Sequence, residues 1–88
     1  MKESEAERML KPLANRRRLA ILSLLAKRGE LRVGDVAEKI RLSFTSTSRH
    51  LRILESAGFL EKEQHSLEMH YRIRPDAPRI LRSVLALL

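Results

Sequence analysis

Residues 35–58 read DVAEKIRLSFTSTSRHLRILESAG, and they decide the fold. Apolar side chains at helical spacing predict a short helix over residues 35–40 and a second helix over residues 44–56. Ser43 is suited to cap the start of the second helix, and Gly58 is suited to follow its end. Two helices joined by so short a connection are typical of a helix-turn-helix. The second helix is expected to turn four side chains towards the core: Phe44, Thr47, Leu51 and Leu54.

The opposite face of this second helix carries small hydroxyl and arginine side chains. Small side chains let a helix approach the floor of a DNA major groove, and arginine binds guanine or phosphate. Such a helix usually meets base edges with its N-terminal residues. A solvated helix surface is the alternative, but the preceding helix and tight turn favour a recognition helix. From this face we predict five DNA-binding residues: Thr45, Ser46, Ser48, Arg49 and Arg52.

A β-hairpin is predicted after the second helix. From Phe59 onward the apolar period changes to two, which indicates strands over residues 59–63 and 67–73 with a polar turn at residues 64–66. One face of the longer strand is expected to be buried, and it consists of Leu67, Met69, Tyr71 and Ile73. A last helix is predicted over residues 76–88, with Pro78 in its first turn.

Upstream of residue 35, two further helices and a short strand are predicted. The first helix covers residues 4–13, with Ser4 as its cap and Pro12 near its end. The second runs from the cap residue Asn15 to Gly29, and residues 31–33 form a short strand. The fold class is therefore mainly α with a small β-hairpin (α+β). The order α-α-β-α-α-β-β-α is that of a winged helix-turn-helix.

The charge of the chain is uneven. The 88 residues have room for one domain, 1–88. The chain has 18 Lys and Arg residues and 11 Asp and Glu residues. Residues 8–52 hold twelve basic and three acidic residues, whereas residues 53–70 hold one basic and four acidic residues. A local excess of positive charge is typical of proteins that bind a polyanion. No secretory signal or long apolar run is visible, so we expect a cytoplasmic protein.

The sequence also limits the class of function. It has no cysteine, no Gly-rich phosphate loop and no constellation of nucleophile and base, so we expect a protein that is not an enzyme. Two alternatives to DNA binding stay open: a winged helix for protein–protein contacts and an RNA-binding winged helix. The outward Arg49 and Arg52 argue against the first, and the scarcity of aromatic side chains argues against the second.

Four stretches, Leu10–Leu22, Leu42–Leu51, Leu54–Leu60 and His70–Ile73, together resemble the ArsR family of winged-helix repressors. The resemblance implies a homodimeric, sequence-specific regulator that binds double-stranded DNA at an imperfect palindromic operator. It also implies that the first and last helices pack across a two-fold axis. Release from DNA would follow binding of an inducer, either a small molecule or a partner protein.

The end helices and the basic residues extend the predicted sites. Arg18 holds a family-typical position, and Lys62 and Arg72 are basic residues of the hairpin, so we add all three to the DNA-binding set. The segments 4–13 and 76–88 are the expected dimerisation elements. Their apolar stripes predict a dimer interface of Met9, Leu10, Leu13, Ile80, Leu81, Val84, Leu85 and Leu88.

The chain departs from the ArsR family in its metal-binding positions. Members that sense metals carry a Cys-x-Cys pair near the third helix, where this chain reads Arg32-Val33-Gly34. Others use His and Asp on the last helix, where this chain has Asp76 and no His. Soft ions require thiolates. We therefore expect no metal site and no cofactor, and no response to arsenite, cadmium or zinc at these positions.

Three histidines and one threonine complete the candidates. His50 lies at the edge of the core face and is expected to be structural. His65 and His70 could bind zinc together with Glu63 and Glu68, but hairpin tips seldom hold ligands rigidly, so no site is predicted there. Thr47 stands where the ArsR family usually has Val, and its hydroxyl is expected to bond back to its own helix.

Overall fold

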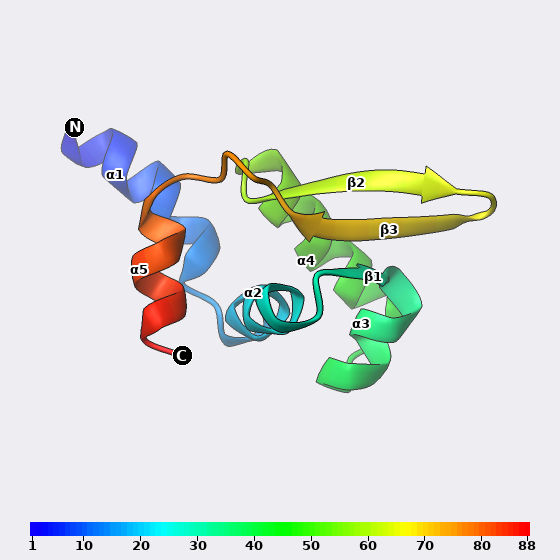
Figure 1. Cartoon of the computed structure of the whole chain (residues 1–88). Helices are drawn as coiled ribbons and strands as arrows, with labels where there is room; N and C mark the ends of the chain where they lie inside the picture. The colour runs from blue at the N-terminus through cyan, green and yellow to red at the C-terminus, as the bar shows by residue number, and fades with distance from the viewer.

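The computed structural model covers residues 1–88 and confirms the predicted order of elements (Figure 1). Five α-helices, one 3-10 turn and three strands follow each other along the chain. They are α1 (Glu3–Leu10), η1 (Lys11–Leu13), α2 (Arg16–Arg28), β1 (Glu30–Arg32), α3 (Val33–Ile40), α4 (Phe44–Ser56), β2 (Leu60–His65), β3 (Glu68–Ile73) and α5 (Ile80–Ala86).

The three strands form one antiparallel sheet in the order β1-β3-β2. Leu31 pairs with Tyr71 and Leu60 pairs with Ile73, which places apolar side chains on the face that packs against α2 and α4. The hairpin formed by β2 and β3, called the wing below, projects beyond the helices (Figure 1). Successive side chains of a strand point to opposite faces of the sheet. The outer face therefore carries only polar and charged side chains, which are Glu30, Arg32, Glu61, Glu63, His65, Glu68, His70 and Arg72.

A single hydrophobic core joins the helices to the sheet. Helix α2 lies at its centre, because Ile21, Leu22 and Leu25 are all buried. Full burial of one such side chain stabilises the fold by about 1.5–3 kcal/mol. The remaining members come from every layer: Leu13, Val33, Val36, Leu51, Leu54, Phe59, Leu60, Tyr71 and Leu81. The core therefore fixes one face of α4 and leaves the other face free.

The helix ends follow the predicted caps with one exception. The Asn15 side chain accepts hydrogen bonds from the backbone N–H groups of Arg17 (2.9 Å) and Arg18 (3.1 Å). The Ser43 hydroxyl accepts one from the N–H of Ser46 at 3.1 Å. The predicted cap at Ser4 is wrong, because α1 already begins at Glu3 and has no side-chain cap. Helix α1 ends before Pro12, as the proline predicts.

The wing is longer than predicted. Gln64 and His65 belong to β2 rather than to the turn, because they pair with Met69 and Glu68. The turn is the dipeptide Ser66-Leu67, and Ser66 adopts a left-handed conformation with φ of 60°. Leu67, predicted to be buried, is therefore at the tip and 95% exposed.

Two further predictions about the ends of helices are wrong. Phe44 is 61% exposed, because the first turn of α4 extends past the edge of the core. Helix α5 begins at Ile80 rather than at Asp76. Pro78 disfavours a helical conformation at the residue before it. The carboxylate of Asp76 is also bound by Arg74, at 2.8 and 3.0 Å, within the turn that precedes the helix.

Candidate nucleic-acid interface

Helix α4 has one buried and one open face. Thr47, Leu51 and Leu54 are fully buried, whereas Thr45, Arg49, Arg52 and Ser56 are exposed. The Ser43 cap fixes the start of the helix, and α3 and α2 pack against its inner side. The exposed face therefore carries hydroxyls and guanidinium groups on a support that is held rigidly. Ser46 and Ser48, also predicted for the interface, are half-buried beside this face.

The arginines of α4 are available to an outside partner. Arg49 forms no ion pair or side-chain hydrogen bond in the structure. Arg52 makes only a 3.4 Å contact with the Ser48 hydroxyl one turn earlier. Both arginines line a shallow hollow together with Arg8 of α1. Three guanidinium groups from two helices thus converge on one hollow, which is suited to a phosphate group.

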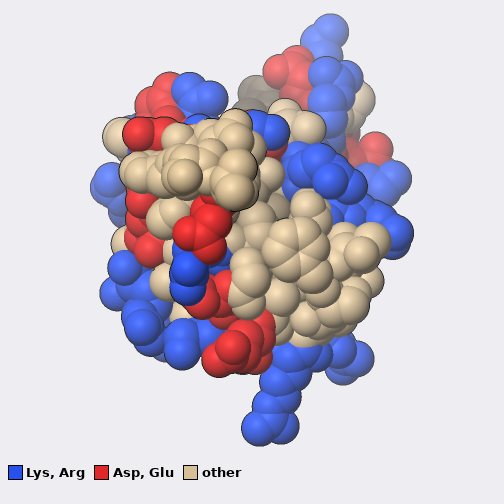
Figure 2. Space-filling model, turned by 90° about the vertical axis from the view of Figure 1, so that its right-hand side faces the viewer, with Lys and Arg blue, Asp and Glu red and all other residues tan.

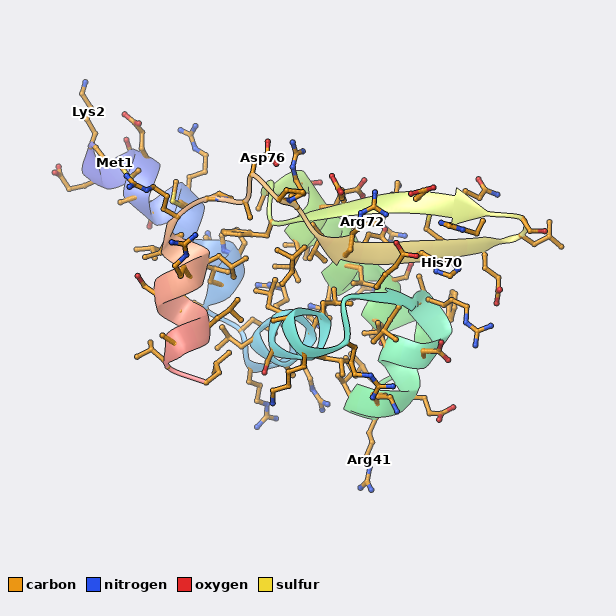
Figure 3. The ribbon with its side chains drawn as sticks, viewed as in Figure 1. Met1, Lys2, Arg41, His70, Arg72 and Asp76 are labelled. Carbon is orange, nitrogen blue, oxygen red and sulfur yellow. The ribbon has the colours of Figure 1, made fainter.

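Two arginines near α4 were missed by the sequence analysis. Arg8 lines the same hollow as Arg49 and Arg52 through the tertiary arrangement of α1 and α4, and its place in the sequence gives no sign of this. Arg41 lies just before the Ser43 cap, has a left-handed backbone with φ of 56°, and extends away from the body of the molecule (Figure 3). A basic residue in the connection between the two helices is the signal that could have identified Arg41.

Arg18, predicted to contact DNA, is occupied inside the protein. Its Nε donates a hydrogen bond to the carbonyl of Pro12, and its Nη1 lies 3.1 Å from Nδ1 of His50. Since arginine can only donate, Nδ1 of His50 is the acceptor and carries no proton. Burial, and then the charge of Arg18, lower the pKa of His50 below its usual range. Both residues are structural, and we leave Arg18 out of the proposed interface.

The wing has few free cations. Lys62 forms a 3.4 Å ion pair with Glu55 of α4. Arg72 lies on the outer face of the sheet, away from α4, and binds Glu61 (2.7 Å), Glu30 (2.8 Å) and Glu63 (3.0 Å). Hydrogen bonds to these carboxylates raise the pKa of Arg72 above its usual range. Arg72 is therefore unavailable for a phosphate, and we leave it out of the interface.

The charge on the side of the molecule from which the wing projects is divided. Figure 2 shows a band of Asp and Glu running down this face, with Lys and Arg gathered on either side of it. Asp35, Glu38 and Glu68 line a hollow between α3 and the wing tip, and Arg32 binds both Asp35 and Glu68. This hollow repels phosphate, so the basic surface lies on α4 and its neighbours rather than on the tip of the wing.

The two end helices form an apolar surface at the end of the molecule opposite the wing (Figure 1). Helix α1 buries none of its residues, and α5 buries only Leu81. A hollow between them is lined by Met9, Leu10 and Ile80 of the predicted dimer interface, together with Met1, Ala6 and Pro78. Leu10 is 46% exposed, and Leu88 is also exposed, while Val84 and Leu85 are half-buried.

Two residues of the predicted dimer interface lie elsewhere. Leu13 and Leu81 are buried in the core of the single chain, so they support the end helices from below and have little surface left for a partner. Leu87 is exposed beside Leu88 and was missed, because it falls outside the apolar stripe of the predicted helix.

The hydroxyl of Thr47 differs from the prediction. Thr47 is fully buried, and its Oγ1 has no hydrogen-bond partner. The predicted bond back to its own helix is therefore not formed.

No helix of the structure has both the length and the apolar character that crossing a membrane requires.

Comparison with known proteins identifies the family of this chain. The family model described as "Bacterial regulatory protein, arsR family" matches residues 15–62. The chain is 37% identical over 70 residues to the arsenical resistance operon repressor of Escherichia coli (strain K12), which covers 80% of this chain and 60% of that protein. It is 34% identical over 65 residues to the transcriptional activator HlyU of Vibrio cholerae, covering 74% of this chain and 59% of HlyU. The chain thus spans about three-fifths of the length of these two relatives.

A solved structure agrees with the observed fold. It is a homodimeric winged helix-turn-helix DNA-binding domain from Mycobacterium bovis, with 36% identity and a TM-score of 0.78. The superposition covers 96% of this chain and 74% of that one. The elements that it shares with this chain include the helix pair and the wing described above. The chain belongs to the arsR family of bacterial regulatory proteins and has its winged helix-turn-helix fold.

Proposed function

We propose that this protein is a sequence-specific, double-stranded DNA-binding transcriptional regulator that reads the major groove with α4. The observation that carries the proposal is the division of α4 into a buried face and an open face of hydroxyls and arginines. Thr45, Ser46 and Ser48 let the helix backbone come close to the bases. Arg49 and Arg52 bind guanine edges or phosphates.

Phosphate contacts come from basic residues around α4. Arg8 shares a hollow with Arg49 and Arg52, and Arg41 extends from the connection just before α4. Such contacts position a protein on the duplex but carry no sequence information. Lys62, at the base of the wing, remains in the proposed set because its partner Glu55 is half-exposed and can exchange for a phosphate.

The proposed assembly is a homodimer with α1 and α5 at its interface. The apolar hollow between these helices and the exposed Leu10 and Leu88 support this choice. The Mycobacterium bovis relative is a homodimer, which agrees with it. A two-fold dimer places two copies of α4 about 34–36 Å apart, in successive major grooves, and therefore favours a palindromic operator.

We propose a repressor, by analogy with the arsenical resistance operon repressor. A dimer that covers two successive turns of promoter DNA blocks access to that DNA. A reporter gene under a bound promoter distinguishes this role from activation, which the name of HlyU indicates for that relative.

An RNA partner has less support in the structure. Stacking of unpaired bases requires exposed aromatic side chains. Phe59 and Tyr71 are buried, so Phe44 is the one Phe or Tyr ring on the surface.

Binding of labelled DNA measured by fluorescence anisotropy tests the proposed function. We expect tighter binding to duplex DNA than to double-stranded RNA of the same sequence. We also expect the logarithm of the association constant to fall linearly with the logarithm of the salt concentration, because binding releases cations from the duplex. Equal binding to both nucleic acids, or none to either, would refute the proposal.

A further inference from the structure

Three side chains from three different strands meet on the outer face of the sheet. Glu30 comes from β1, His65 from β2 and His70 from β3. Nδ1 of His70 lies 3.2 Å from Oε2 of Glu30, and Nε2 of His65 lies 3.9 Å from the same oxygen. The three donor atoms all lie within 4.8 Å of one another. The sheet register thus builds a set of two imidazoles and one carboxylate.

The spacing of these atoms suits a small tetrahedral ion. Zinc binds nitrogen and oxygen ligands at about 2.0–2.1 Å, so two ligand atoms of a tetrahedral site lie about 3.3–3.4 Å apart. The distance from Glu30 to His70, 3.2 Å, is close to this value, and the distance to His65, 3.9 Å, is somewhat longer. The two imidazole rings also lie close together, with centroids 4.4 Å apart and a tilt of 40° between the ring planes.

A second layer of contacts orients the carboxylate. Arg72 Nη1 binds Oε1 of Glu30 at 2.8 Å, which leaves Oε2 directed at the histidines. Glu63 lies beside the same histidine, since its Oε1 is bound by Arg72 and its Oε2 lies 3.4 Å from Nε2 of His65, the nitrogen that also faces Glu30. Ligands held by outer hydrogen bonds are typical of metal sites.

The charge around the three side chains also favours a cation. Arg72 carries one positive charge and contacts three carboxylates, those of Glu30, Glu61 and Glu63, which leaves a net charge of −2. The rest of the molecule is strongly basic, with a formal net charge of +7 for the whole chain. A local acidic cluster on such a protein attracts divalent cations to this face. Glu30, His65 and His70 are all partly exposed, so an ion has access from solvent.

We propose that Glu30, His65 and His70 bind a divalent transition-metal ion of the zinc class, with water as the fourth ligand. Neutral imidazole and carboxylate are ligands that zinc accepts. The site lies on β1 and the wing, and it uses none of the positions in the third and last helices where the resemblance to metal-sensing ArsR members places their ligands. The sequence analysis paired the two histidines with Glu63 and Glu68 and expected no site, because hairpin tips seldom hold ligands rigidly. The structure places Glu30 of β1 beside them.

A bound ion would join the free end of the wing to the body of the protein. Glu30 follows Gly29 at the end of α2, whereas His65 is the last residue of β2 before the turn. One ion therefore links all three strands and restricts movement of the hairpin. It also neutralises the acidic side of the wing.

Calorimetric titration of the full chain with zinc chloride, in the absence of DNA, tests this proposal. We expect one zinc ion per chain with a micromolar or tighter dissociation constant. Glu30→Gln, His65→Ala and His70→Ala should each weaken binding by about tenfold or more. Glu61→Gln is the matched control, because Glu61 lies on the same face and binds Arg72 but contacts neither histidine. It removes the same charge without removing a ligand, so it should weaken zinc binding far less than Glu30→Gln does.

A measurement on the wild-type protein makes the test independent of the variants. Imidazole nitrogen spectra should show zinc-induced shifts at His70 Nδ1 and His65 Nε2 and none at His50. Absence of saturable binding, equal loss of affinity in Glu61→Gln, or coordination through His50 would each overturn the proposal. DNA binding does not enter these measurements, so their outcome is separate from that of the proposed function.

Discussion

Arg18 Nη1 lies 3.1 Å from Nδ1 of His50, so the first turn of α2 is hydrogen-bonded to the middle of the recognition helix α4. The same guanidinium group binds the Pro12 carbonyl in η1 through Nε. One side chain thus connects α2, η1 and α4 and helps to set the position of α4 relative to the other two. Because the histidine accepts this bond, the connection requires a neutral imidazole.

Protonation of His50 at acidic pH should lower the free energy of unfolding. Its pKa is lowered in the native state by burial and by Arg18, and the unfolded value is about 6.5. The unfolded chain therefore binds this proton at a higher pH than the native protein does. The free energy of unfolding should fall as the pH drops below about 6.5, and the effect should end below the native pKa.

Urea unfolding of the wild type and of His50→Gln from pH 7.5 to 5 measures this effect. The difference between the two proteins isolates His50 from the other titrating groups. Nuclear magnetic resonance titration should give a His50 pKa below 6.5 that rises in Arg18→Met. A native His50 pKa above 6.5 would show that the imidazole is not held neutral.

Replacing Thr47 with valine should stabilise the fold. The Thr47 hydroxyl is buried without a partner, and a buried unsatisfied group costs about 1–3 kcal/mol. Valine has nearly the same shape, so we expect a gain of about 1 kcal/mol in the free energy of unfolding. Thr45→Val on the exposed face is the control and should stay within about 0.5 kcal/mol of the wild type. A loss of stability in Thr47→Val would mean that the hydroxyl is satisfied.

The open face of α4 should determine DNA affinity. Arg49→Ala should cost about 1–3 kcal/mol on a specific site if the side chain reads a base. Ser48→Leu should cost more, since a bulky group prevents close approach of the helix. Arg28→Ala removes the same charge from the exposed last turn of α2 and serves as the control. Unchanged binding isotherms for Arg49→Ala and Ser48→Leu would exclude α4 as the recognition helix.

A charge in the apolar surface of the end helices should separate the dimer. Leu10→Glu places a carboxylate in the hollow between α1 and α5 without disturbing the buried core. We expect sedimentation to show a folded monomer for this variant and a dimer for the wild type. Leu67→Glu, at the exposed wing tip, should remain dimeric. A wild type that is monomeric at all concentrations would contradict the proposed assembly.

The sequence predicted α4 well because its signals are local. The Ser43 cap, the two-faced pattern and Gly58 lie within the helix or beside it, and the structure confirms the helix from Phe44 to Ser56. The exposure of Phe44 depends on where the neighbouring elements end, and a local sequence pattern cannot predict this. The same reason explains the wing turn, whose position depends on pairing across the hairpin.

Contacts between distant residues were beyond the sequence analysis. Glu30 is 35 residues from His65, and they come together only through the pairing of β3 with both β1 and β2. Arg18 was assigned to DNA because it holds a position typical of the ArsR family, whereas its bond to His50 is a tertiary contact. Arg72 shows the same limit, since its three carboxylate partners come from β1 and β2.

Selection of bound sequences from a random duplex DNA library, using the full chain, tests the central claim most directly. Two copies of α4 related by a two-fold axis should select inverted half-sites with centres about 34–36 Å apart, one helical turn of DNA. Arg49→Ala should relax the preference at a position within each half-site. A library that shows no enrichment, or enrichment of a single asymmetric site, would contradict the account of a dimer that reads DNA through α4.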